Sequence, residues 1–104
     1  VTVRSRGVAE KCTFCVQRIQ ETRLAARLRG EEPADGDIVP ACAQTCPASA
    51  ITFGDLNDPH SRVRARTGNG RAYTLLDGLN LQPAVTYLAL QRRDRSPEDD
   101  VNGN

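Results

Sequence analysis

The sequence predicts a small α+β fold with a thin hydrophobic core, and three observations lead to this prediction. The chain has 104 residues, which is enough for one small domain. Only 38% of the residues are hydrophobic and 4% are aromatic, and small domains of this kind often need a metal, a disulfide or a partner. Helical patterns alternate with short apolar runs along the chain. We therefore expect one module over residues 1–90 and a disordered, charged tail over residues 91–104.

The longest predicted element is a helix over residues 13–29. This stretch lacks glycine and proline, and its apolar residues recur at intervals of three, four and seven positions. Gly30 then fits the C-terminal end of the helix. A short helix is expected over residues 40–46, because Pro40 suits a first helical position and Pro47 limits the helix.

The following residues predict a strand and a further helix. Residues 49–53, "SAITF", form a short apolar run that is typical of a strand. Asp58 is expected to cap a helix that begins at Pro59. The basic run over residues 62–66 would be a solvated helix face or a docking patch for a partner subunit. Two more apolar runs follow, "AYTLL" and "AVTYLAL".

Charge and hydropathy argue against several classes of protein. The formal net charge is +1, from 14 basic and 13 acidic residues, so we expect no nucleic-acid partner. No apolar run is long enough to cross a bilayer, and the first residues do not form a signal peptide. Because the chain contains no methionine, we expect that Val1 is not the natural start and that the chain is a piece of a longer polypeptide.

The four cysteines form two pairs with the spacing C-x2-C-x26-C-x3-C-P: Cys12 with Cys15, and Cys42 with Cys46. Disulfides would support a thin core, but the C-x2-C spacing favours metal or redox chemistry. A structural zinc site uses two such pairs, yet zinc gives no reason for the proline after the last cysteine. A thiol redox motif would need a βαβ setting, and the sequence shows none upstream.

An iron–sulfur site explains the pattern best. The bacterial ferredoxin run is C-x2-C-x2-C-x3-C-P, and both its beginning and its end are present here. The middle spacing is stretched to 26 residues, and loop-closure entropy rises only with the logarithm of loop length. Pro47 keeps Cys46 out of the helical region, so that the chain turns away there. We predict that Cys12, Cys15 and Cys42 hold one cluster and that Cys46 ligates a neighbouring one. In the alternative, all four close on a single [4Fe–4S] cluster.

Three segments carry a resemblance to a known family: "RGVAEKCTFCVQRIQ", "PACAQTCPASAITFGDLNDPHSRV" and "YTLLDGLNLQPAVTYL". Together they resemble the last cluster motif of the iron–sulfur subunits of molybdopterin oxidoreductase complexes. Among these, the chain looks most similar to the iron–sulfur subunit of alternative complex III. In this family the motifs pack as paired ferredoxin-like units. The resemblance therefore implies a ferredoxin-like iron–sulfur module, half of a two-cluster unit, from the C-terminal part of a longer subunit.

The resemblance implies electron transfer in a membrane-associated, quinol-oxidising respiratory complex, with no catalytic site in this chain. The implied cofactors are [4Fe–4S] clusters, with a [3Fe–4S] cluster as an option in the full subunit. The implied partners are the other cysteine motifs of the same subunit, a polytopic quinol-binding membrane subunit and c-type cytochrome subunits. The implied location is the periplasmic side of a bacterial inner membrane. Two alternatives are the iron–sulfur subunit of a polysulfide, dimethyl sulfoxide or tetrathionate reductase, and a structural zinc module for assembly.

Some residues near the cysteines invite a functional interpretation. Lys11 and Arg18 would raise the potential of a cluster through their charge, or else they are simply solvated. Phe14 would shield a cluster from water, although ordinary packing would explain it equally well. His60 is the only histidine, and an exposed position at a helix start is expected for it. The polar residues before it fit turn and capping chemistry better than a calcium loop: Asp55, Asn57 and Asp58.

Overall fold

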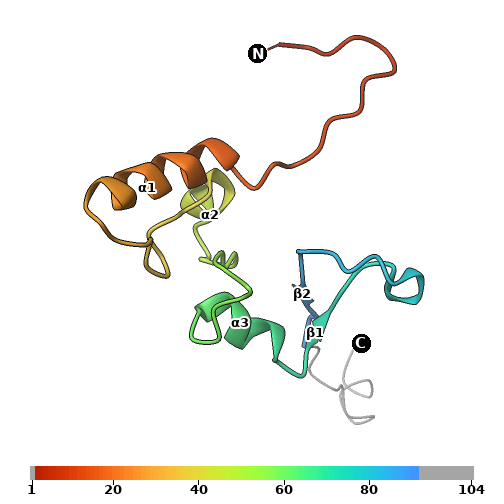
Figure 1. Cartoon of the computed structure of the whole chain (residues 1–104). Helices are drawn as coiled ribbons and strands as arrows, with labels where there is room; N and C mark the ends of the chain where they lie inside the picture. Colours follow the sequence, from red (N-terminus) through yellow and green to blue (C-terminus); the bar gives the residue numbers. More distant parts are fainter. Residues whose placement is uncertain (1, 92–104) are drawn as a thin grey trace, which may run out of the picture. The chain divides into compact units, whose positions relative to one another are not determined.

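The computed structural model of the chain describes residues 2–91 (Figure 1). Three α-helices come first along the chain: α1 (Val16–Leu28), α2 (Ala41–Thr45) and α3 (Arg62–Thr67). They are followed by strand β1 (Ala72–Tyr73), the 3-10 helix η1 (Asp77–Leu79) and strand β2 (Tyr87–Leu88). The chain divides into two compact units, Val1–Arg66 and Thr67–Asn104. Among the helices described, none has the length and apolar character needed to span a membrane.

Helix α1 confirms the helix predicted over residues 13–29, with narrower bounds. It begins directly after Cys15, which has a left-handed backbone with a φ of 53° and therefore lies outside the helical repeat. It ends before Gly30, whose φ of 72° is a conformation that favours a residue without a Cβ atom. The N–H of Glu31 donates to the carbonyl of Ala26 at 3.0 Å and so closes the last turn.

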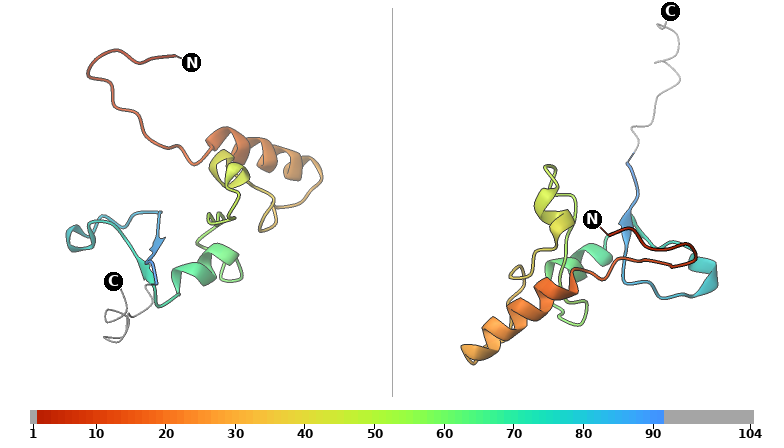
Figure 2. Two further views of the ribbon diagram at one scale, coloured as in Figure 1. Left: turned by 180° about the vertical axis from the view of Figure 1, so that it is seen from behind. Right: turned by 90° about the horizontal axis from the view of Figure 1, so that it is seen from above.

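Helix α2 confirms the short helix predicted over residues 40–46. Pro40 is extended, with a φ of −68° and a ψ of 156°, and the first helical residue is the one after it. The helix ends because Cys46 is extended as well, with a ψ of 109°. Pro47 accounts for this, since proline disfavours the helical region for the residue before it. The start of α2 lies near the start of α1 (Figures 1 and 2), where the N–H of Ala41 donates to the sulfur of Cys15 at 3.4 Å.

The strand predicted over residues 49–53 is wrong. These residues form no regular secondary structure. Ser49 has a φ of 49°, which interrupts the extended run at its first residue. The N–H of Ala50 donates to the sulfur of Cys46 at 3.4 Å, so it is not available to a neighbouring strand. A local hydrogen bond to a side chain has replaced the strand pairing that the apolar run suggested.

The predicted start of the third helix is also wrong, because α3 begins at Arg62 and not at Pro59. The carboxylate of Asp58 accepts the N–H of His60 at 2.9 Å and forms a turn ahead of the helix. The cap is instead Ser61, whose Oγ accepts the N–H of Arg64 at 3.2 Å. Ser61 is only 1% exposed, so this capping hydroxyl is part of the interior of the first unit.

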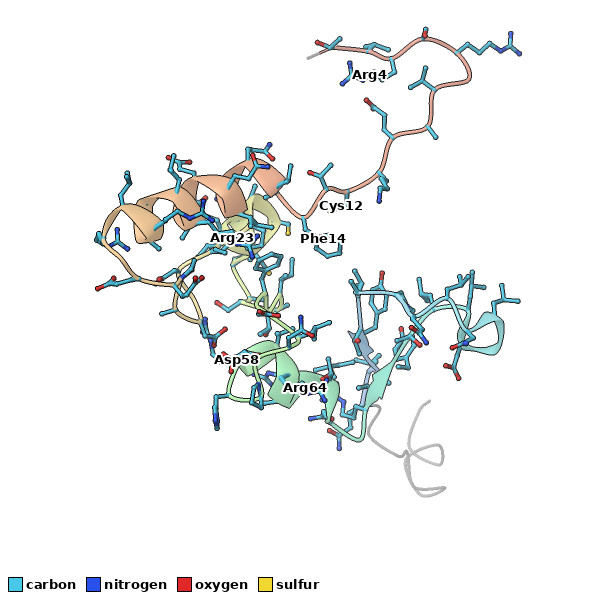
Figure 3. All side chains as sticks on the ribbon, viewed as in Figure 1. Arg4, Cys12, Phe14, Arg23, Asp58 and Arg64 are labelled. Atoms are coloured by element: carbon cyan, nitrogen blue, oxygen red, sulfur yellow. The ribbon has the colours of Figure 1, made fainter. Side chains whose placement is uncertain are left out.

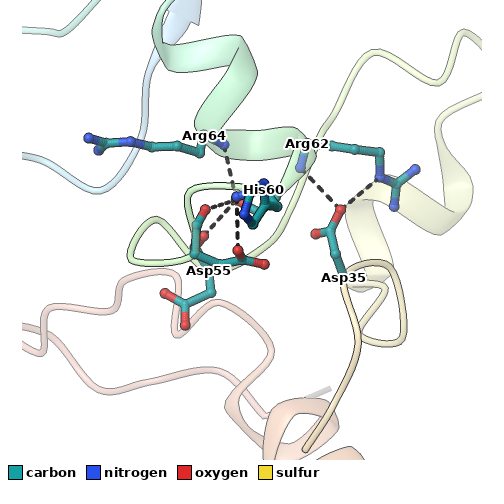
Figure 4. A network of polar contacts seen from close by, with 7 residues as sticks. Asp35, Asp55, His60, Arg62 and Arg64 are labelled. Carbon is teal, nitrogen blue, oxygen red and sulfur yellow. Dashed lines mark hydrogen bonds and ion pairs between the residues drawn. The ribbon is translucent and has the colours of Figure 1, made fainter.

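The loop that precedes α2 is tied to the start of α3 (Figure 4). The carboxylate of Asp35 accepts the backbone N–H of Arg62 at 3.1 Å and its Nε at 3.2 Å. A Cβ atom on Gly36 would lie 2.8 Å from Nη2 of Arg62, and one on Gly54 would lie 2.8 Å from Oδ1 of Asp35. Two glycines therefore permit the close approach of this loop.

The second unit contains a short hairpin built from the last two apolar runs. Strands β1 and β2 are antiparallel, with Ala72 opposite Leu88 and Tyr73 opposite Tyr87. The two tyrosine rings stack with their centroids 5.7 Å apart. The tail predicted over residues 91–104 lies outside the described residues from residue 92 onward.

The buried interior is very small in the part of the chain that the structure describes. Among the described residues, Ala26 and Pro40 are the apolar ones that are buried, and Ala26 is 1% exposed. Large apolar side chains elsewhere remain accessible, including Leu24 at 59% and Leu28 at 81% on α1. The thin core expected from composition is confirmed, and these units contain little hydrophobic stabilisation of their own.

Candidate metal centre

The first cysteine pair lies on a tight turn that leads directly into α1, where Figure 3 labels Cys12 and Phe14. The backbones of Phe14 and Cys15 are left-handed, with φ values of 57° and 53°. Residues other than glycine rarely adopt this backbone conformation, and those that do cluster at functional sites. The N–H of Phe14 donates to the sulfur of Cys12 at 3.3 Å. The turn therefore provides a backbone donor to one of the two sulfurs.

The second pair lies on α2 and at its end. Cys42 is the second residue of α2, and Cys46 follows the last one in an extended conformation. The sulfur of Cys46 accepts the N–H of Ala50 at 3.4 Å. This confirms the expectation that Pro47 makes the chain leave the helix at Cys46.

The two motifs meet through the start of α2. The N–H of Ala41 donates to the sulfur of Cys15 at 3.4 Å, across 26 positions of sequence. Arg18 reinforces the same junction from the first turn of α1. Its Nη1 donates to the carbonyl of Val39 at 2.9 Å and to Oε1 of Gln44 at 2.7 Å. The helix and loop between the motifs thus bring Ala41, the residue before Cys42, to the sulfur of Cys15.

The chemistry of the four cysteines suits a thiophilic metal. All four are free, so the disulfide alternative is not realised in the structure. Three of the sulfurs accept a backbone N–H, from Phe14, Ala41 and Ala50. Such hydrogen bonds surround thiolate ligands and tune the metal that they hold. Within residues 2–91, no three side chains of the ligand types are gathered closely enough to form a metal site. The donor set fits an iron–sulfur cluster or zinc by its chemistry.

The ring of Phe14 contacts the segment that follows the second motif. It lies 6.4 Å from the ring of Phe53, measured between centroids, in a tilted arrangement. Both rings thus pack together beside the first cysteine pair, and Phe14 remains 38% exposed. This contact is the ordinary packing that the sequence allowed for, and it links the C-x2-C turn to residues 49–53.

Arg18 is not simply solvated, since its guanidinium joins α1 to the segment around α2. The sequence predicted only an effect of its charge and did not predict this bridge. The residues before α3 form the hydrogen-bonded turns that the sequence predicted. Asp55 accepts the N–H of Asn57 at 2.8 Å, and Asp58 accepts that of His60.

Asp35 and Ser61 were missed by the sequence analysis. Asp35 fixes the loop to α3 through Arg62, and Ser61 donates from its Oγ to the backbone carbonyl of Asp55 at 2.7 Å. The only signal for Asp35 was its position before Gly36 in a loop. The printed sequence places neither residue in a cysteine motif, and their hydrogen bonds to Arg62, Asp55 and Arg64 position the segments around α3.

Comparison with known proteins gives relatives but no family model that matches the chain. The chain is 45% identical over 92 residues to the iron–sulfur cluster-binding subunit of menaquinone reductase from Nitratidesulfovibrio vulgaris, covering 86% of this chain and 36% of that protein. It is 38% identical over 93 residues to the Hdr-like menaquinol oxidoreductase iron–sulfur subunit 1 from Archaeoglobus fulgidus, covering 86% and 31%. It is 46% identical over 54 residues to the B subunit of polysulfide reductase from Wolinella succinogenes, covering 52% and 21%.

All three relatives are longer proteins than this chain. The chain spans about a third of the length of the first two. Those two relatives carry iron–sulfur in their names, and all three are parts of oxidoreductases. The homologues of this chain are iron–sulfur subunits of oxidoreductase complexes.

Proposed function

We propose that this chain binds iron–sulfur clusters through Cys12, Cys15, Cys42 and Cys46 and transfers electrons within a larger oxidoreductase complex. The observation that carries the proposal is the hydrogen bond from the N–H of Ala41 to the sulfur of Cys15, which joins the two halves of a stretched ferredoxin-type motif. The cluster would supply one-electron transfer. The protein supplies the thiolates, the backbone donors to them and the fixed position of one motif against the other.

We place the complex in the wider class of quinone-linked respiratory oxidoreductases. Two relatives are named for menaquinone or menaquinol, which supports a quinone or quinol as the reactant of the whole complex. The iron–sulfur subunit of a reductase fits the relatives at least as well as that of alternative complex III. The proposal therefore names the class, and alternative complex III is one member of it.

The proposed assembly is a ferredoxin-like pair of cluster sites. Cys12, Cys15 and Cys42 hold one [4Fe–4S] cluster, and Cys46 ligates the next. The extended backbone of Cys46 and the bond of its sulfur to Ala50 support this division, because they turn Cys46 away from α2. The missing ligands come from other cysteine motifs of the same polypeptide. The remaining proposed partners are a membrane subunit that binds quinol and c-type cytochrome subunits, at the periplasmic face of the membrane.

The first test is the metal content of the intact complex that contains this polypeptide. Iron and acid-labile sulfide in stoichiometric amounts are expected, with an EPR signal that appears or changes on reduction by dithionite. Zinc at the four cysteines without a cluster signal from them would overturn the proposal and would favour the structural zinc module.

Exchange of single cysteines tests how the ligands are divided. Cys42→Ser and Cys46→Ser are a matched pair, because each removes one thiolate from the same segment. We expect Cys42→Ser to abolish the EPR signal of one cluster and Cys46→Ser to abolish that of another. If both variants remove the same signal and leave every other cluster intact, the four cysteines serve a single cluster.

A further inference from the structure

The junction between the two cysteine motifs depends on one side chain that is not a ligand. Arg18 is half-buried on the first turn of α1, and its Nη1 atom holds two acceptors on either side of α2's first turn. Val39 lies before α2 and Gln44 lies within it. A single nitrogen therefore fixes both the entry to α2 and its body against α1.

The residue held between these two anchors is the donor to Cys15. Ala41 lies between Val39 and Gln44, and its N–H donates to the sulfur of Cys15 at 3.4 Å. As the first residue of α2, Ala41 has an N–H with no partner inside the helix, which leaves it free for the sulfur. Rotation or withdrawal of α2 would lengthen this bond before it affected the bonds of Cys12 and Cys46, since those two are made by donors close in sequence.

We propose that Arg18 is a positioning residue that sets the reduction potential of the cluster at Cys12, Cys15 and Cys42 by holding the Ala41 N–H on the Cys15 sulfur. This inference rests on the proposed function. A hydrogen bond to a ligating sulfur stabilises the more negative, reduced cluster and so raises its potential. The mechanism differs from a direct effect of the arginine charge, because it acts through the position of α2.

The test separates position from charge by changing the neutral partner of Arg18. Gln44→Leu removes one acceptor and alters no charge, and Gln44→Asn shortens the side chain by one methylene while it keeps the amide. Arg18→Gln removes the charge and weakens the bridge. Arg27→Gln is the control, since it removes the same charge from the last turn of the same helix. Midpoint potentials are measured by EPR-monitored redox titration of the intact complex.

We expect Gln44→Leu to lower the equilibrium constant for reduction of this cluster about tenfold. For a one-electron couple this is a fall of about 59 mV in its midpoint potential. Gln44→Asn should give a smaller shift in the same direction, and Arg27→Gln should give none. Combining Gln44→Leu with Arg18→Gln should lower the potential by less than the sum of the two single shifts. If Gln44→Leu does not retain the cluster, the shift in Gln44→Asn decides the question.

The failures of the two proposals are distinguishable. A wild-type complex without iron and sulfide at these cysteines overturns the proposed function. A wild-type complex with its cluster, in which the Gln44 variants that retain the cluster keep an unchanged potential, overturns the role of Arg18. A potential that shifts equally in Arg18→Gln and Arg27→Gln but not in the Gln44 variants would assign the effect to charge alone.

Discussion

At the scale of single residues, the C-x2-C turn depends on backbone conformations that only a few positions adopt. Phe14 and Cys15 are adjacent and both left-handed. Each such residue costs on the order of 1–3 kcal/mol and persists only when its surroundings hold it in place. The Phe14 N–H bond to Cys12 and the packing of its ring against Phe53 provide part of that support. The strain is therefore located in the turn that carries two of the proposed ligands.

Outside the motifs, the position of Gly54 depends on the absence of a side chain. A methyl group at this position would lie 2.8 Å from Oδ1 of Asp35 and 3.1 Å from Cγ1 of Val63. Because Arg62 already holds that carboxylate, it has little room to move away. We expect Gly54→Ala to destabilise the protein by about 1–3 kcal/mol, measured as a lower midpoint of urea unfolding of the intact polypeptide.

The matched control for this change is Gly78→Ala. A Cβ atom at Gly78 meets nothing within 4 Å, so this variant should unfold within about 0.5 kcal/mol of the wild type. Equal urea midpoints for the two variants would show that the loop around Asp35 yields to the added methyl group. The close docking of the loop on α3 would then not contribute to stability.

At the scale of elements, local patterns predicted the helices and failed for the strand. The apolar spacing before Gly30 and the two prolines around α2 act within a few residues, so the sequence revealed α1 and α2. A strand over residues 49–53 would need a pairing partner, which the apolar pattern cannot supply. The start of α3 was misplaced because Asp58 caps a turn and leaves the helix to Ser61.

In the candidate site, too, local spacing predicted some features and packing between distant residues determined the others. Spacing alone was sufficient to nominate the four cysteines and to expect that Pro47 would end α2. The bridge from Arg18 to Gln44 and the bond from Asp35 to Arg62 join residues 26 and 27 positions apart. Such contacts depend on how segments pack, and no local pattern in one sequence encodes them.

Pro47 ends α2 and keeps the backbone of Cys46 extended. In Pro47→Ala the residue before it gains access to the helical region, and α2 gains freedom to extend through Cys46. We expect iron to be lost to a chelator about 2- to 5-fold faster than in the wild type, from a loss of about 0.4–1 kcal/mol of backbone restriction. Pro83→Ala, which lies far from the cysteines in sequence, is the control and should release iron at the wild-type rate. Equal release from both variants would contradict a directing role for Pro47.

At the scale of the whole molecule, the buried interior is too small to explain the order of the first unit. Of the residues described, Ala26 and Pro40 are the buried apolar ones, while Leu24 and Leu28 on the same helix as Ala26 remain exposed. Short helices are marginal without tertiary support. Binding energy from a metal or cluster becomes folding energy when the ligands come together only in the folded state. Helices α1 and α2 should therefore depend on the cofactor that the cysteines hold.

Hydrogen exchange followed by mass spectrometry tests this dependence on the intact complex, before and after iron is removed by a chelator under reducing conditions. Peptides from α1 and α2 should exchange faster once the cluster is lost, because Arg18 is then the main bridge between the two helices. Peptides from the β1–β2 hairpin provide an internal control, since that hairpin is closed by its own strand pairing and by the stacked Tyr73 and Tyr87. We expect their exchange to change little. Unchanged exchange in α1 and α2 after complete loss of iron would show that the first unit keeps its fold without the cofactor, and the cysteines would then bind metal on a scaffold that is already formed.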